Sequence, residues 1–574
     1  MNLTGFINAM SFFNLVIHCF LLVSLPFFVS SSTNNQRSIT FDDNYYVEGV
    51  IILPYAEIHE TFTAYYDGAA NRSRIDYYGD LVLTLQRGDI NFDDDDVQGV
   101  SYKIAYNVDA AGNPGRVCFQ VNGSSIDPVA PQSAFPDLTP FIYQGSKACP
   151  QYGSEFKGSG ICEKYTNIVI NGEKKSKYTF WMKRNQSDGS PIPVLYDMEG
   201  YNSLFGSHYD RYQVFYQNYR PRSVSAEVFE VTLNMTCGSF PGTGAGKVRH
   251  LHNPMSEFVN DEATREAQVS RAFNLFKSAH NKNYENNLTE EKRRNQFRHN
   301  HRFIESHNRR NIHYKLKVNH LADFMDSELR YMRGRLRSKG YNGGSPFGLS
   351  ESKQRPPELD WRIAGAVTPV KDQAICGSCW SFGTIGTIEG VHFVKTGHLV
   401  RLSEQQLVDC SWDQGDNGCD GGEDFRAYAY IKKAGGISLD EDYGAYLGQD
   451  GKCHDSKVPK VVKLAGFVNV TSGSAEALEL ALFEQGPVTV AIDASQKTFS
   501  FYSHGVYYDE NCGNTPDDLD HQVLAVGYGL LYGQRYWLIK NSWSTYWGND
   551  GYILMAQKNN NCGVTTNPTY PLLV

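Results

Sequence analysis

The sequence predicts a multidomain chain with an antiparallel all-β N-terminal domain, a charged α-helical segment and a cysteine-containing C-terminal domain. Its 574 residues are too many for one compact core, so several domains are expected. Residues 40–240 are rich in tyrosine and alternate between apolar and polar positions, which favours strands. Residues 257–335 show helical spacing and contain no cysteine. The net charge of −9 argues against a nucleic-acid partner.

The N-terminus carries a candidate targeting segment. Residues 10–29 are apolar and are followed by three small residues at 30–32, which predicts a signal peptide over 1–31. The first arginine is Arg37, so the usual basic start is missing and an uncleaved anchor is the alternative. Glycosylation sequons lie at Asn71, Asn122, Asn185, Asn234, Asn287 and Asn469. Together these features predict the secretory pathway, with the lysosome or the extracellular space as destination.

The β-rich domain is expected over residues 40–240, with a glycine-rich linker over 241–256. Four aspartates at 93–96 could bind calcium, although a solvated loop explains them more simply, and no metal site is assigned. The domain gives no chemical signature of its own. It is a candidate for recognising a ligand or a surface.

The charged segment contains one well-defined helical face. It consists of Glu290, Arg294, Phe297, Asn300, Ile304 and Asn308. These residues are three or four apart and therefore lie on one side of a helix. Taken alone, this pattern indicates an amphipathic helix whose opposite, basic face is solvated.

The C-terminal domain contains a candidate nucleophile, Cys379. It begins a predicted helix, whose N-terminus favours the reactive thiolate. Gln373, six residues earlier, offers an amide that can donate to a developing oxyanion. His521 offers a base and Asn541 a group to orient it. These residue types suit a cysteine protease.

The cysteine count supports a reactive thiol. Four cysteines between 118 and 237 make two bridges, and the seven from 376 to 562 leave one over. Cys376 and Cys379 also form a C-x-x-C, which is typical of redox pairs. That alternative leaves His521 and Asn541 without a role, and a zinc site from scattered ligands is weaker still.

Several motifs resemble the papain family, in its cathepsin L-like branch. They are Cys-Gly-Ser-Cys-Trp at 376–380, Leu-Ser-Glu-Gln at 402–405, Gly-Cys-Asp-Gly-Gly at 418–422 and Tyr-Trp-Gly at 546–548. The helical face resembles the E-R-F-N-I-N signature of the family's prosegments, with Asn319 and Asp323 in a companion motif where Leu321 replaces an aromatic residue. Segments 74–79 and 206–210 also resemble insect haemocyte papain-like proteinases with a long N-terminal extension.

The resemblance implies a zymogen. Residues 257–340 would be an α-helical inhibitory prosegment, and 357–574 an α+β, two-lobed papain-like peptidase domain. The implied activity is endopeptidase cleavage of proteins or peptides without a cofactor, with the chain's own prosegment as inhibitor. A binding protein built on the β domain and a catalytically dead scaffold are the competing functions. The second is disfavoured because the candidate residues are all present.

The resemblance also assigns site residues. Gln373, Cys379, His521 and Asn541 would be catalytic, with Trp543 shielding the His–Asn bond. The substrate-binding set is Gly421, Gly422, Glu423, Asp424, Ala491, Leu519, Asp520, Trp543 and Asn567. The implied disulfides are Cys376–Cys419, Cys410–Cys453 and Cys512–Cys562. Because Glu423 and Asp424 stand near the rim, where aliphatic-preferring relatives have apolar residues, we expect a shallower, more polar pocket that tolerates basic or polar side chains.

Histidines crowd the helical segment, and their charge rises between pH 7 and 5. They are His299, His301, His307, His313 and His320. One hypothesis is that this charging loosens the prosegment and aids activation in acid. The alternative is that they titrate on the surface without consequence.

Overall fold

The structure is a computed structural model that describes residues 39–92, 96–108, 114–152, 156–157, 160–231, 235–239, 253–310, 313–348 and 355–574. The predicted signal peptide, most of the 241–256 linker and residues 93–95 of the aspartate run lie outside these residues. Among the helices described, none has both the length and the apolar character needed to span a bilayer.

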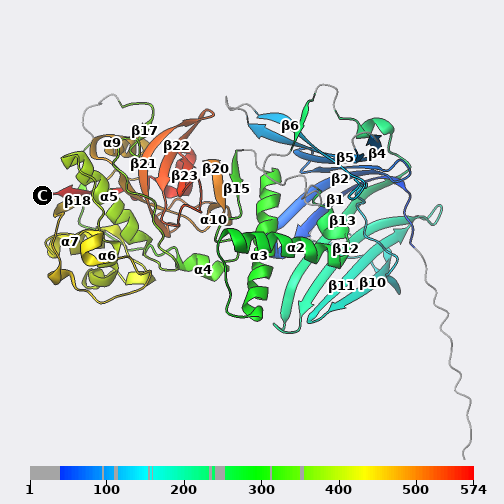
Figure 1. Cartoon of the computed structure of the whole chain (residues 1–574), viewed down its shortest axis with the longest axis horizontal. Coiled ribbons are helices and arrows are strands. Elements are labelled where there is room, and N and C mark those ends of the chain that lie inside the picture. The colour runs from blue at the N-terminus through cyan, green and yellow to red at the C-terminus, as the bar shows by residue number, and fades with distance from the viewer. Residues whose placement is uncertain are drawn as a thin grey trace, which may run out of the picture. The chain divides into compact units, whose positions relative to one another are not determined.

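The N-terminal region forms a 12-stranded sheet in the order β14-β6-β5-β4-β3-β2-β1-β13-β12-β11-β10-β7 (Figure 1). Its strands are β1 (Asn44–Leu53), β2 (Ile58–Asp67), β3 (Arg72–Tyr77), β4 (Val82–Phe92), β5 (Val97–Val108), β6 (Pro114–Asn122), β7 (Ile142–Ala148), β10 (Ile161–Asn171), β11 (Lys174–Arg184), β12 (Pro191–Asn202), β13 (Ser207–Pro221) and β14 (Cys237–Ser239). A separate hairpin joins β8 (Gln151–Tyr152) and β9 (Phe156–Lys157). Neighbouring strands pair antiparallel except β14, which runs parallel to β6. The prediction of an all-β region is confirmed.

Tyrosines supply much of the sheet's main core. Tyr45, Tyr77, Tyr165 and Tyr212 are almost completely buried and pack with Val47, Ile51, Phe62 and Phe180. Alternation along the strands places these large rings on one face of the sheet, which explains the tyrosine-rich pattern. Two disulfides, Cys118–Cys237 and Cys149–Cys162, close this region.

The middle segment is helical and contains α1 (Ser256–Val259), α2 (Glu262–Ala279), α3 (Asn287–Arg310), β15 (Tyr314–Leu316), α4 (Asp326–Tyr331) and β16 (Ser345–Pro346). Asp261 caps α2 by accepting from the backbone N–H of Thr264. The helical face predicted from spacing lies on α3: Phe297 and Ile304 are buried in a core with Phe273 and Phe276. The amide of Asn300 donates to the Ala322 carbonyl at 3.0 Å.

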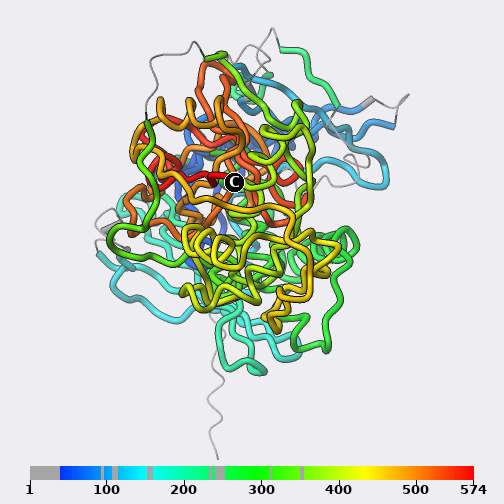
Figure 2. Tube along the Cα trace, turned by 90° about the vertical axis from the view of Figure 1, so that its left-hand side faces the viewer, coloured from blue at the N-terminus to red at the C-terminus, as the bar shows by residue number. Residues whose placement is uncertain are grey.

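The C-terminal part is mixed α and β. Its elements are β17 (Leu359–Asp360), α5 (Cys379–Thr396), α6 (Glu404–Cys410), α7 (Asp424–Lys433), α8 (Asp440–Tyr443), β18 (Leu464–Asn469), α9 (Ala475–Gln485), β19 (Val488–Ile492), α10 (Lys497–Ser500), β20 (Tyr502–Tyr507), β21 (His521–Leu531), β22 (Gln534–Lys540), β23 (Tyr552–Ala556) and β24 (Thr569–Leu573). One core gathers around α5–α7 and a second around β19–β23, which occupy neighbouring regions in Figure 2. β15 of the middle segment pairs antiparallel with β20, so the two parts share one sheet.

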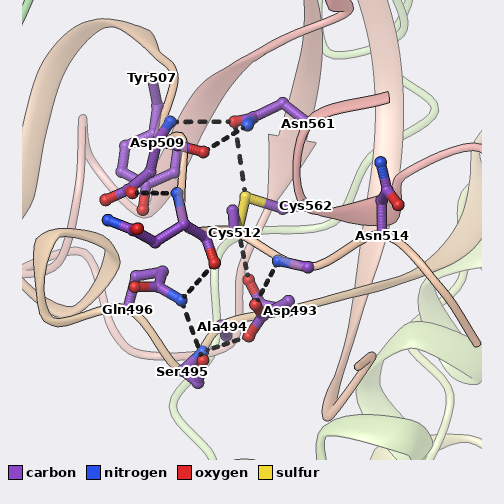
Figure 3. Close-up of a disulfide and its surroundings, with 12 residues drawn as sticks. Asp493, Ala494, Ser495, Gln496, Tyr507, Asp509, Cys512, Asn514, Asn561 and Cys562 are labelled. Atoms are coloured by element: carbon purple, nitrogen blue, oxygen red, sulfur yellow. Dashed lines mark hydrogen bonds between the residues drawn. A yellow bond between two sulfur atoms is a disulfide. The ribbon is translucent and has the colours of Figure 1, made fainter. Parts of the chain in front are cut away.

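Three disulfides tie the C-terminal part: Cys376–Cys419, Cys410–Cys453 and Cys512–Cys562. Figure 3 shows the last of these at the end of β19, where the backbone N–H of Asp493 donates to the Cys562 carbonyl at 3.0 Å. The side chain of Asp493 accepts from the N–H of Gly513 at 2.7 Å. Within the described chain Cys379 is the remaining free cysteine.

Candidate active site

Cys379 is the first residue of α5 and is completely buried. The disulfide at Cys376 fixes the turn before the helix, and the indole N–H of Trp380 donates to the Gly418 carbonyl at 3.2 Å. The thiol therefore lies at a helix N-terminus whose position is held from both sides. Such a terminus favours a negative charge on sulfur.

His521 begins β21, and Asn541 directly follows β22. Because these strands pair, the two side chains meet: His521 Nε2 lies 2.8 Å from Asn541 Oδ1. The other ring nitrogen, Nδ1, is buried and has no hydrogen-bond partner among the described residues. The ring of Trp543 is tilted against the imidazole, with the ring centroids 4.9 Å apart, and is itself fully buried, so it covers the His–Asn bond.

The charge state of the pair differs from the sequence-based expectation. A lowered thiol pKa was expected from the helix and the histidine. Burial instead raises the pKa of Cys379 to about 11 and lowers that of His521 to about 4. Both groups are therefore neutral at pH 7, because the middle segment covers them and removes the water that would solvate an ion pair.

Gln373 lies behind the thiol with its amide already engaged. Its Nε2 donates to the carbonyls of Met332 and Cys376, each at 2.8 Å. Its Oε1 accepts from the hydroxyl of Ser542 at 2.6 Å, which fixes the amide's orientation. A carbonyl of the middle segment thus occupies the donor that was predicted to bind an oxyanion.

The segment after α4 passes over the thiol. Gly422 and Gly334 hydrogen-bond through their backbones at 2.9 Å, and Arg335 forms a parallel bridge with Gly422. A Cβ added to Gly334 would lie 1.8 Å from the Gly377 carbonyl, so only glycine fits there. A Cβ added to Gly421 would lie 2.6 Å from the Gly334 carbonyl. Gly421 and Gly422, predicted to bind substrate, therefore pack against the backbone of this covering segment.

The side chain of Arg335 fills a pocket beside the thiol. Its Nη1 donates to the Leu519 carbonyl at 3.1 Å, and Nη2 donates to the Asn567 side-chain oxygen at 3.0 Å. Burial lowers the pKa of this guanidinium, and the nearby carboxylates Asp424 and Glu423 counteract that shift. Four of the predicted substrate-binding residues thus surround one basic side chain.

Both carboxylates are buried rather than standing at a rim. Asp424 accepts from the Thr569 hydroxyl. Glu423 accepts from the Ser338 backbone N–H at 3.0 Å and from Arg426 Nε at 3.1 Å. Burial raises the pKa of Asp424.

Asp520 and Ala491 lie at other points of the site. Asp520 pairs with Arg333 Nε at 3.0 Å, and burial raises its pKa to about 6. Ala491 lies in β19 opposite Gln522, whose amide donates to Thr489 instead of reaching Arg335. Nothing in the local sequence pattern marks Arg333, Arg335 or Ser542 as residues of the site.

Comparison with family models gives two matches. Residues 355–572 match the papain family cysteine protease model, and residues 273–329 match the cathepsin propeptide inhibitor domain (I29). Together they cover most of the C-terminal part and residues 273–329 of the middle part, and neither includes the N-terminal sheet.

Individual relatives agree. The chain is 45% identical over 322 residues to a cathepsin L-like peptidase of Aedes aegypti, covering 53% of this chain and 94% of the relative. It is 42% identical over 313 residues to digestive cysteine proteinase 2 of Homarus americanus, covering 54% and 96%. The solved digestive procathepsin L2 proteinase of Tenebrio molitor larval midgut matches with a TM-score of 0.50 and 34% identity, over 53% of this chain and 100% of that structure. These matches leave no room in the relatives for a counterpart of the N-terminal sheet.

Proposed function

Because this chain belongs to the papain family of cysteine proteases and is a cathepsin L-like endopeptidase zymogen, we propose that Cys379, His521 and Asn541 carry out its reaction. The thiolate of Cys379 attacks the scissile carbonyl and forms a carbon–sulfur bond. Gln373 Nε2 and the Cys379 backbone N–H donate to the oxyanion. The imidazolium of His521 then gives its proton to the leaving amine, and water hydrolyses the thioester.

One observation carries this assignment: His521 Nε2 is bound to Asn541 while its buried Nδ1 lacks a partner in the described chain. An imidazole whose outer nitrogen is fixed by an amide oxygen presents the other nitrogen in one orientation. That nitrogen can accept the thiol proton once the cleft opens. The asparagine then stabilises the ring position without taking up a charge.

Thiol labelling tests the assignment. In the zymogen at pH 7, we expect iodoacetamide to alkylate Cys379 at least about 100-fold more slowly than in the processed enzyme, since burial holds its pKa at about 11. Mass spectrometry of the peptide containing Cys379 measures the rate. Rapid labelling of the intact zymogen would contradict the closed, neutral pair.

Acid activation follows from buried histidines. His307 is 5% exposed, and burial lowers its pKa to about 3; Arg310 and Lys315 lower it further. His320 also has a pKa lowered to about 3, by burial and by Lys282, His280 and Lys317. Freed from the fold, each imidazole returns to 6.5. The prosegment fold is therefore most stable above pH 6.5, where both imidazoles are neutral. It loses this stability as pH falls towards 3, because the unfolded segment binds the protons more readily.

His307 makes a quantitative prediction. At pH 5, keeping the buried His307 imidazole neutral lowers the stability of the prosegment fold by about 2 kcal/mol. This follows from the 1.5-unit difference between pH 5 and the imidazole's ordinary pKa of 6.5. The lower stability loosens α3 from Tyr314 of β15, which lies 4.9 Å from the imidazole. His307→Gln cannot charge, so we expect the midpoint of acid activation to shift downward by at least about half a pH unit. The exposed His313→Gln is the matched control and should leave the midpoint unchanged.

The pocket around Arg335 supports a substrate preference. A guanidinium already fits there between two oxygen acceptors, with Asp424 and Glu423 close enough to favour its charge. A substrate side chain in the same pocket would meet the same groups. The enzyme would therefore accept arginine at the second residue before the cut.

We also propose domain boundaries and a location for the enzyme. We place the signal peptide at 1–31, the β domain at 40–240, the linker at 241–256, the prosegment at 257–340 and the peptidase at 357–574. The cores around α5–α7 and β19–β23 would be the peptidase's two lobes. Five disulfides favour an oxidising compartment, and hence a lysosomal or secreted enzyme.

A further inference from the structure

α3 has a second buried face besides the one in the prosegment core. Arg298, Arg302 and Arg309 are four and seven residues apart and lie about a third of a turn away from Phe297. Arg298 and Arg302 are only 3% and 5% exposed. Such a row of arginines would be solvated on an isolated amphipathic helix. Here it packs against the N-terminal sheet.

Asp210 of β13 receives two of these arginines. Arg302 Nη1 lies 2.7 Å from its Oδ1, and Arg298 Nη1 lies 3.4 Å from its Oδ2. Asp210 is 1% exposed, so its charge depends on these partners rather than on water. His299 adds a bond between its Nε2 and the Tyr209 carbonyl at 3.2 Å.

A second buried carboxylate binds an arginine of α3 in the same way on another strand of the sheet. Glu60 of β2 is 2% exposed and accepts from Arg309 Nε at 2.6 Å and from the Ser306 hydroxyl at 2.9 Å. Ser306 also bonds to the hydroxyl of Tyr78 at 2.6 Å. The last two turns of α3 are therefore anchored to the sheet.

α2 and α1 extend the same interface. Lys174 of β11 pairs with Glu266 of α2 at 2.9 Å and with Glu291 of α3 at 2.8 Å. The Tyr178 hydroxyl donates to Glu262 at 2.6 Å. Phe258 of α1 belongs to the core of the sheet, and its carbonyl accepts from the Tyr212 hydroxyl at 2.8 Å. The helices thus contribute apolar, neutral polar and charged contacts.

We propose that the N-terminal sheet is a docking surface for the chain's own prosegment, and that residues 253–310 stay bound to it after the chain is cut before the peptidase. The matches cover 53–54% of this chain and the family models leave out the N-terminal sheet, so they do not account for the contacts between the sheet and the buried arginine row. Activation then releases the peptidase from a sheet–prosegment unit, rather than releasing a free prosegment.

The ion pairs of this interface persist in acid, whereas His299, whose pKa burial lowers to about 4, opposes the contact as pH falls below 6.5. Arg302, Arg298 and His299 hold the pKa of Asp210 well below its usual range, against the effect of burial. Arg298, Lys174 and Arg294 lower the pKa of Glu266 to about 2. Since both folded pKa values are lowered, these ion pairs persist at pH 5 and weaken only as pH falls towards those values.

The test separates the three parts of the full chain. A Cys379→Ala chain carries recognition sequences for an unrelated protease at residues 241–252 and 349–354. After both cuts, gel filtration at pH 7 and pH 5 shows which part elutes with the prosegment. We expect it to elute with the sheet at pH 5 while the peptidase elutes separately. Elution of the prosegment alone, or with the peptidase only, would overturn the proposal.

Variants locate the contact. Arg298→Gln with Arg302→Gln should weaken binding of the prosegment to the sheet at least about tenfold. Arg310→Gln, on the exposed end of the same helix, should not change it. Asp210→Asn asks the same question from the sheet side if the double variant fails to fold. Equal binding by all variants would also overturn the proposal. Because association needs no active thiol, this outcome is independent of the catalytic assignment.

Discussion

Cys379→Ala is expected to lower kcat/KM for peptide hydrolysis by at least about 10⁴-fold. Alanine removes the sulfur that forms the covalent intermediate, and none of the other ten cysteines in the described chain is available because all are in disulfides. The measurement is hydrolysis of a broad peptide library at pH 5 under mild reduction, before and after acid incubation. Wild-type activity should appear only after incubation.

The control addresses maturation. A chain without Cys379 cannot process itself, so the variant is cut by an unrelated protease at residues 349–354 before the assay. Its thermal unfolding should match that of wild type, because alanine fits the space of the thiol. Substantial hydrolysis by the cut variant would refute the nucleophile. A processed wild type that stays silent would favour the catalytically dead scaffold.

Asp424→Asn is expected to lower kcat/KM for substrates with arginine at the second residue before the cut by about 10- to 100-fold. The amide keeps the size of the side chain and can still accept from Thr569, but it removes the negative charge that favours a guanidinium in this pocket. Substrates with leucine at that position should change by less than about threefold. Matched fluorogenic peptides that differ only there measure both values.

Asp413→Asn is the matched control, since it removes one carboxylate that is 86% exposed and weakly paired with Lys433 at 3.7 Å. It should leave both substrates unaffected. A library profile with strict selection for leucine or phenylalanine in the wild-type enzyme would contradict the basic pocket altogether.

Site features that depend on residues close together in the sequence could be predicted, whereas those that depend on distant residues could not. The spacing of Phe297, Asn300 and Ile304 predicts one helix face because helical periodicity is local. Cys379 and His521 could be found from residue types and motif context. Their pKa values could not, because burial by a segment whose contacting residues, Met332 and Gly334, lie more than forty residues before Cys379 determines them.

The sheet contacts of the prosegment were equally out of reach. Arg298 and Arg302 read as a solvated basic face because their partner, Asp210, lies about ninety residues earlier. The same applies to Arg335, which local pattern does not distinguish from the neighbouring arginines. Long-range ion pairs have no sequence period, so only the folded chain identifies them.

α3 lies between two partners, and this limits how its sequence can change. In a prosegment with a single partner, half of a helix surface faces water and tolerates substitution. Here Phe297 and Ile304 fill one core while Arg298 and Arg302 satisfy buried acids on the other side. We therefore expect related chains that carry this sheet to show few accepted changes on both of these faces of the helix. Chains that lost the sheet should vary freely along the arginine row alone.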